Sequence, residues 1–260
     1  MRSAADPSGV LRRLGVQLYT VRHLLAADVR GVLGALRRIG YDEVEFAGLH
    51  GTDPHEVRAI LDDLGLTAPA AHVGLDALQT DLGAHLDVAD ILGHRYLVVP
   101  GLPEALRASP DGYRRAAAAL NALGERTSAA GIRLAYHNHA GEFEPFEDGR
   151  SGYDVLLDET DPALVSMELD VFWAVHAGHD PVDWLSRFPG RFPLLHVKDR
   201  AASGAMTDVG AGEIDVARII ECAAQGGLEH IVVEHDEPTD ALASVRDSYA
   251  ALARLGLRYS

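Results

Sequence analysis

The chain has 260 residues, of which 47% are hydrophobic and 24% are charged, so it is too apolar for a disordered protein and long enough for one sizeable core. Lys and Arg number 23 against 39 Asp and Glu, and the resulting net charge of −16 disfavours nucleic acids and anionic membranes as partners. The single cysteine, Cys222, excludes an intrachain disulfide and a cysteine-rich zinc site.

Short apolar runs alternate with longer segments of helical character from one end of the chain to the other. In chain order, the predicted strands are Gly15–Tyr19, Glu43–Ala47, Ala68–Val73, Tyr96–Pro100, Ile132–His137, Val165–Asp170, Pro193–Val197 and Ile231–Glu234. Several of these runs are apolar almost throughout, which is typical of parallel strands that are covered on both faces.

The segments between the strands carry the signals of helices. Residues 29–39 present one apolar stripe, made by Val32, Leu33, Leu36 and Ile39. Asp53-Pro54 and Ser109-Pro110 predict helix starts, because a capping side chain precedes a proline at the first helical position. Glycines that follow helical stretches predict helix ends, at Gly40, Gly65, Gly93, Gly131 and Gly227.

Eight such β–α units in about 260 residues predict an α/β fold, a single (β/α)8 TIM barrel over residues 1–260 with a loose tail over about the first ten. A doubly wound sheet is disfavoured, because the turn after the first strand, residues 20–23, has no glycine. No apolar run is long enough for a membrane span or a signal peptide, so we expect a cytoplasmic protein.

Acidic and imidazole side chains gather at the ends of the last four predicted strands, where barrels of this kind hold their active sites. Asp170, His196 and Glu234 would converge there, and this donor set suits one Mn²⁺, Mg²⁺, Co²⁺ or Zn²⁺ ion. A fourth donor would come from the fifth strand or its loop. Glu142 and His137 both qualify by position, and His139 shares the strand phase of His137.

Four stretches together resemble a known family: YHNHAGEF from Tyr136, ELDVFWAVHAGHDPVDWL from Glu168, LHVKD from Leu195 and VGAGEID from Val209. They look like the sugar phosphate isomerase/epimerase group of the xylose-isomerase-like TIM barrels, and the opening GVQLYTVR from Gly15 also fits. Since the matches touch both ends of the chain, the resemblance covers the whole predicted domain.

The resemblance implies one divalent metal ion, Mn²⁺ first, held by Asp170, His196, Glu234 and a fourth ligand. Relatives use a glutamate at the end of the fifth strand, and Glu142 of the YHNHxxEF pattern is favoured over His137 for that place. Glu142 and Glu234 match the pair of glutamates that also serve as acid and base. Lys198, the only lysine of the chain, would reach the substrate oxygens or stabilise an enediolate; the alternative is a salt bridge to Asp199, Glu168 or Asp170.

Further side chains at or just after strand ends are candidates for contacts with the substrate: Glu45, His72, His137, His139 and Trp173. Residues 200–212, rich in Ala and Gly, are predicted to form a flexible loop over the site.

The predicted function is that of a metal-dependent isomerase or epimerase of carbohydrate metabolism, which transfers a proton through a metal-bound enediolate of a ketose, keto-inositol or related polyol. A dehydratase of an inosose, a dehydroshikimate-like compound or a 3-keto-sugar is the alternative, and a non-catalytic sugar-binding protein is a further one. An endonuclease of the same scaffold is disfavoured by the negative charge. A homo-oligomer is expected only by analogy with the family.

Overall fold

The computed structural model describes residues 13–256, so the tail expected over about residues 1–10 lies outside the described residues. Eight parallel strands close into a barrel in the order β1-β10-β7-β6-β5-β4-β3-β2. The chain therefore forms the predicted (β/α)8 TIM barrel. The barrel strands are β1 (Leu14–Gln17), β2 (Glu43–Phe46), β3 (Thr67–His72), β4 (Tyr96–Val99), β5 (Arg133–His137), β6 (Val165–Asp170), β7 (Leu194–Val197) and β10 (His230–Val233).

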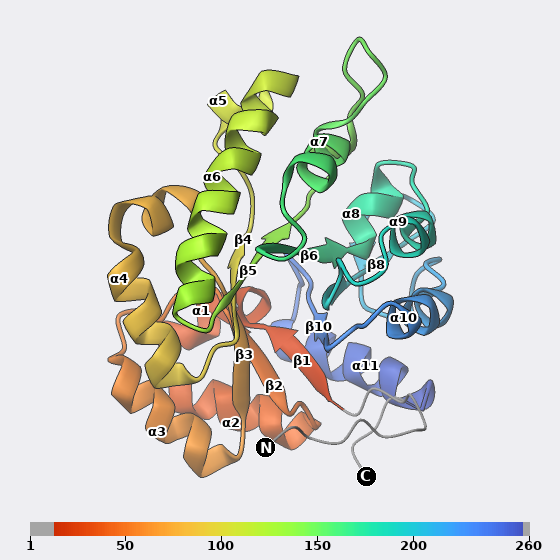
Figure 1. The fold of residues 1–260 in the computed structure, drawn as a ribbon. Helices are drawn as coiled ribbons and strands as arrows, with labels where there is room; N and C mark the ends of the chain where they lie inside the picture. The colour runs from red at the N-terminus through yellow and green to blue at the C-terminus, as the bar shows by residue number, and fades with distance from the viewer. Residues whose placement is uncertain (1–12, 257–260) are drawn as a thin grey trace.

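Helices surround the strands on the outside of the barrel (Figure 1). They are α1 (Arg22–Leu25), α2 (Val29–Ile39), α3 (Pro54–Leu64), α4 (Leu75–Leu92), α5 (Glu104–Arg107), α6 (Pro110–Ala129), α7 (Gly152–Glu159), α8 (Val171–His176), α9 (Pro181–Arg187), α10 (Val216–Gln225) and α11 (Ala241–Arg254). Two 3-10 turns, η1 (Leu18–Val21) and η2 (Gly141–Phe143), and a small antiparallel pair, β8 (Asp199–Arg200) with β9 (Met206–Thr207), lie in the loops. Among the described helices, none is long and apolar enough to cross a membrane.

The helix signals read from the sequence are confirmed by the caps. The side chain of Asp53 accepts hydrogen bonds from the backbone N–H groups of His55 and Glu56 at the start of α3. Ser109 caps α6 in the same way through the N–H of Gly112. These bonds satisfy donors that a helix start otherwise leaves without partners, which explains why the two helices begin where they do.

The first strand is shorter than predicted. β1 ends at Gln17 rather than at Tyr19, and the chain turns into η1. The cause is local, because the side-chain oxygen of Gln17 accepts a hydrogen bond from the backbone N–H of Tyr19 at 3.0 Å and so caps the turn. Tyr19 consequently lies on a turn at the mouth of the barrel instead of in the sheet.

Two apolar layers support the polar mouth. The main core packs the outer faces of the strands against the helices. A second, smaller cluster fills the barrel interior and consists of Ala70, Tyr96, Val98, Ala135 and Leu194. Three of its members precede His72, His137 and His196 by two residues, and residues two apart on a strand face the same side. The imidazoles therefore rest directly on this apolar layer at the carboxyl ends of the strands.

Candidate metal centre and active site

The register of the barrel brings the predicted strand-end residues together. Asp170 on β6 pairs with His196 on β7, and His196 pairs with Val232 on β10, two residues before Glu234. Because side chains two apart share a face, Asp170, His196 and Glu234 all point into the barrel mouth. Asp170 and His196 are fully buried there and Glu234 is 6% exposed.

Four side chains, here called the outer group, bring one donor atom each within 4.8 Å of one another: His137, Asp170, His196 and Glu234. Nε2 of His137 lies 3.7 Å from Oδ2 of Asp170, and Nδ1 of His196 lies 2.9 Å from Oε2 of Glu234. Oδ2 of Asp170 is buried and accepts no hydrogen bond of regular geometry among the described residues, although Nζ of Lys198 lies 3.0 Å away. Two carboxylates, two imidazoles and an oxygen left without a hydrogen bond fit a divalent cation of the Mn²⁺ to Zn²⁺ series.

A second set, here called the inner group, lies deeper and consists of His72, His137, Glu168 and His196. Oε2 of Glu168 lies 2.8 Å from Nε2 of His72 and 2.9 Å from Nδ1 of His137. An ionised carboxylate can only accept, so each of these imidazoles donates an N–H to it. This bond leaves the lone pair of His137 on Nε2, which is the atom that faces Asp170.

The charges of the two imidazoles that both groups share differ. Burial lowers the pKa of His196, but the carboxylates of Glu168, Glu45 and Glu234 outweigh it and raise the pKa well above its ordinary value. Burial and the neighbouring His196 together lower the pKa of His137 well below its ordinary value. In the metal-free chain His196 is therefore an imidazolium, whereas His137 is a neutral imidazole.

Lys198 places an ammonium group beside the outer group. Its Nζ lies 3.0 Å from Oδ2 of Asp170, 2.8 Å from Oε2 of Glu234 and 2.6 Å from Oδ1 of Asp236. Burial lowers its pKa, but these three carboxylates outweigh burial and raise it. Lys198 therefore stays charged and neutralises carboxylates that would otherwise repel one another.

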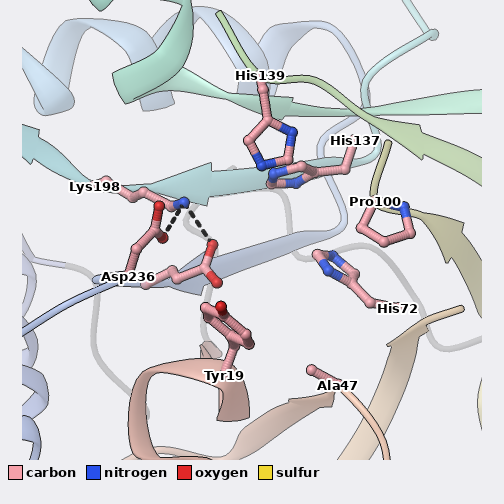
Figure 2. Close-up of a pocket in the computed structure, with 9 residues that line it drawn as sticks. Tyr19, Ala47, His72, Pro100, His137, His139, Lys198 and Asp236 are labelled. Carbon is pink, nitrogen blue, oxygen red and sulfur yellow. Dashed lines mark hydrogen bonds and ion pairs between the residues drawn. The ribbon is translucent and has the colours of Figure 1, made fainter. Parts of the chain in front are cut away.

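These side chains open into a cavity of about 390 Å³ at the mouth of the barrel (Figure 2). In the view of Figure 2, His137 and His139 lie on one side of the cavity and Tyr19 lies across from them. Its lining consists of Tyr19, Ala47, His72, Pro100, His137, His139, Lys198, Glu234 and Asp236. The volume is sufficient for a small sugar or cyclic polyol.

Two residues predicted to contact a substrate lie beside this cavity rather than in its lining. Glu45 is fully buried, and its Oε2 accepts a hydrogen bond from Nε2 of His196 at 2.5 Å. Trp173 lies behind His139, with ring centroids 5.6 Å apart, and its backbone N–H donates to Asp170. In this structure Glu45 therefore contacts His196, and Trp173 contacts His139 and Asp170.

Glu142, favoured in the sequence as the fourth metal ligand and as an acid/base group, lies outside both groups. Its Oε1 accepts a hydrogen bond from the hydroxyl of Tyr136 at 2.6 Å, and its Oε2 accepts one from the backbone N–H of His139 at 3.0 Å. The residue sits in η2, three positions after His139, so its carboxylate folds back and closes the turn. Among the described residues, the outer group contains His137 and does not contain Glu142.

Two carboxylates of the site were not among the predicted site residues. Glu168 shares the strand phase of Asp170, and Asp236 lies two residues after Glu234. This two-residue spacing is visible in the sequence, but it does not distinguish a residue of the site from a structural one. Tyr19 was hidden by the turn that Gln17 caps.

Comparison with known proteins identifies the family of this barrel. The model of the family described as xylose isomerase-like TIM barrel matches residues 33–255. The chain belongs to this family. The resemblance inferred from the strand-end motifs is thereby confirmed. In this xylose isomerase-like barrel, the residues matched by the family model include every strand from β2 to β10.

Named relatives in the family are distant. An inosose dehydratase from Geobacillus kaustophilus is 28% identical over 198 residues, which cover 65% of this chain and 61% of that protein, less than two thirds of its length. An inosose dehydratase from Lacticaseibacillus casei is 23% identical over 249 residues, covering 78% of this chain and 83% of that protein. A solved sugar phosphate isomerase/epimerase from Parabacteroides distasonis is 28% identical with a TM-score of 0.82, over 96% of both chains.

Proposed function

We propose that this xylose isomerase-like barrel is a metal-dependent enzyme that removes the proton next to the carbonyl group of a sugar or polyol. The observation that carries the proposal is the double position of Glu234, which belongs to the outer group and also lines the cavity. This double position supports a role in which one carboxylate meets both a cation and a substrate.

The donors that would hold the cation are His137, Asp170, His196 and Glu234. A divalent ion bound there supplies a Lewis acid that polarises the carbonyl and acidifies the neighbouring C–H bond. His137 is proposed as a ligand in place of Glu142, because its Nε2 faces Asp170 while Glu142 is engaged in its own turn.

The chain's own groups supply the proton transfer. Glu234 would take the proton, since its carboxylate borders the cavity. Lys198 holds its ammonium 2.8 Å from Glu234 and lines the same cavity, so it can balance negative charge that develops on the substrate oxygens. His72 and His139 line the cavity as well and offer hydrogen bonds to hydroxyl groups. Glu168 holds the imidazole of His72 through a hydrogen bond of 2.8 Å, and the ring of His139 packs against that of His137.

Return of the proton decides the outcome. Return to the same carbon from the opposite face gives the epimer. Return to the former carbonyl carbon, with the hydroxyl proton passed to the former carbonyl oxygen, gives the aldose–ketose isomer. Epimerisation or isomerisation is the reaction that we propose first. Loss of water instead of proton return gives a dehydratase. The names of the inosose dehydratase relatives specifically favour this second candidate.

The test is proton exchange in D₂O, with ketoses and keto-inositols as substrates and Mn²⁺ supplied, followed by NMR. We expect deuterium at the carbon next to the carbonyl, loss of exchange with a chelator, and no exchange in Glu234→Gln. Glu237→Gln is the matched control, because that carboxylate follows the same strand but is 81% exposed. Absence of exchange with every substrate, or normal exchange in Glu234→Gln, would overturn the proposal. Ultraviolet absorbance of an enone product would identify the dehydratase.

A further inference from the structure

The loops after the seventh and eighth strands are the part of a TIM barrel where a phosphate group is frequently bound. Such a site needs free backbone N–H groups, a free helix start or unpaired cationic side chains. In this chain the two loops comprise residues 198–215, after β7, and residues 234–240, after β10.

Four backbone donors of the first loop are taken by a single side chain, Asp199. Oδ2 of Asp199 accepts hydrogen bonds from the N–H groups of Gly210 at 2.9 Å and Gly212 at 3.0 Å. Oδ1 of the same carboxylate accepts from Arg200 at 2.8 Å and Ile214 at 3.1 Å. Asp199 is 1% exposed, so four converging N–H groups form an anion cradle that already contains an anion.

The geometry of this cradle depends on its glycines. Gly210 has a φ of 84°, a conformation that side chains other than glycine rarely adopt. A Cβ at Gly212 would lie 2.2 Å from Oδ1 of Asp199. The segment predicted to be a flexible loop is thus anchored around Asp199, and it also contains the β8–β9 pair.

The helix starts nearby are also closed. Asp215 caps α10 by accepting from the N–H of Arg218, and Asp240 caps α11 by accepting from the N–H of Ala243. Each carboxylate occupies the position that a phosphate would take at a helix N-terminus.

Charge in the barrel mouth is unfavourable for a further anion. Lys198 is the only Lys or Arg among the described residues that line the cavity, and it is already paired with three carboxylates. Carboxylates in and under the mouth number five: Glu45, Glu168, Asp170, Glu234 and Asp236. These five carboxylates outnumber the positive charges of Lys198 and a divalent ion together, so no net positive charge is left for a phosphate.

We propose that this site takes an uncharged polyhydroxy carbonyl compound and rejects phosphate esters, and that Asp199 is the residue that closes the phosphate position. The inference rests on the proposed function for the reaction. Its first part, the preference for an uncharged substrate over a phosphate ester, is here called the charge rule. The charge rule concerns binding and can be tested separately. It distinguishes this chain from what the name of the Parabacteroides neighbour would suggest for a substrate.

The first experiment compares neutral ketoses with their phosphate monoesters as substrates of the Mn²⁺-loaded protein. We expect kcat/KM to be at least about 100-fold higher for the neutral member of a pair, since like charges placed together at an interface cost several kcal/mol. Preferred turnover of the phosphate ester would overturn the charge rule and leave the proposed function standing. Turnover of neither would count against the proposed function, and the second experiment would then decide the charge rule.

The second experiment uses inorganic phosphate and formate as probes of the cradle. The melting temperature of Asp199→Ala should be lower than that of the wild type. Either anion should raise the melting temperature of the variant part of the way back, relative to chloride at equal ionic strength. Neither phosphate nor formate should raise the melting temperature of the wild type. If Asp199→Ala does not fold, Asp199→Asn serves, because it removes the charge and keeps the shape. A wild type stabilised by phosphate as strongly as the variant would show an open phosphate site and overturn the proposal.

Discussion

Nδ1 of His196 lies 2.9 Å from Oε2 of Glu234, and the two residues come from neighbouring barrel strands 38 positions apart in sequence. In the metal-free chain this contact joins an imidazolium to a carboxylate. A metal ion held by both residues would replace the proton on Nδ1. The contact thus links metal binding to proton release.

Metal affinity should therefore rise with pH. The pKa of His196 is raised, so the imidazole is protonated at neutral pH and must lose one proton to become a ligand. We expect about one proton released per Mn²⁺ and up to about a tenfold gain in affinity per pH unit, until the pKa of the folded protein is passed. Calorimetric titration in two buffers of different ionisation enthalpy measures the proton. An affinity that is the same at pH 6 and pH 8 would contradict this assignment.

The same raised pKa has a consequence for stability without metal. A raised pKa in the folded state means that the protonated form stabilises the fold, fully so below the ordinary value of 6.5. The free energy of unfolding of chelator-treated protein should then decrease as the pH rises from that value through the folded pKa. Urea titrations at several pH values check this, with His196→Gln as the variant in which this pH dependence should shrink.

The choice between His137 and Glu142 as a ligand can be settled by a matched pair of variants. His137→Ala should weaken Mn²⁺ binding by at least about 100-fold. Loss of a direct ligand costs more than loss of a residue that only hydrogen-bonds to a ligand, which typically costs about 10–100-fold. Glu142→Gln should bind Mn²⁺ within about threefold of wild type by the same reasoning, because glutamine can still accept from Tyr136 and His139. Competition with a chelating dye measures both. The reverse result would restore Glu142 as the ligand.

Glu168 should affect the metal without touching it. Its carboxylate directs the tautomer of His137, so Glu168→Gln should reduce metal affinity by about 10–100-fold. Nitrogen NMR of the histidine rings should show whether the proton of His137 leaves Nδ1. An unchanged tautomer with unchanged affinity would mean that Glu168 only fills space.

Replacement of Lys198 should act oppositely on folding and on metal binding. Lys198→Met leaves three carboxylates without their counter-ion, which should cost the metal-free protein about 3 kcal/mol of unfolding free energy. The same variant should bind Mn²⁺ more tightly, because the cation no longer competes with an ammonium for Asp170 and Glu234. Unfolding with and without metal, together with a metal titration, tests both. Equal destabilisation in the two states would show that Lys198 contributes packing alone.

The amino-acid sequence by itself determined the eight β–α units, the caps at Asp53 and Ser109, and the strand-end positions of Asp170, His196 and Glu234. These features depend on periodicity and on neighbours a few residues away, which a linear pattern contains. The tertiary structure decided that His137 rather than Glu142 faces Asp170, that Lys198 pairs with three carboxylates, and that Asp199 fills its own cradle. Those outcomes depend on barrel register and on the direction of each side chain, so residues far apart in the chain become neighbours only after the barrel has closed.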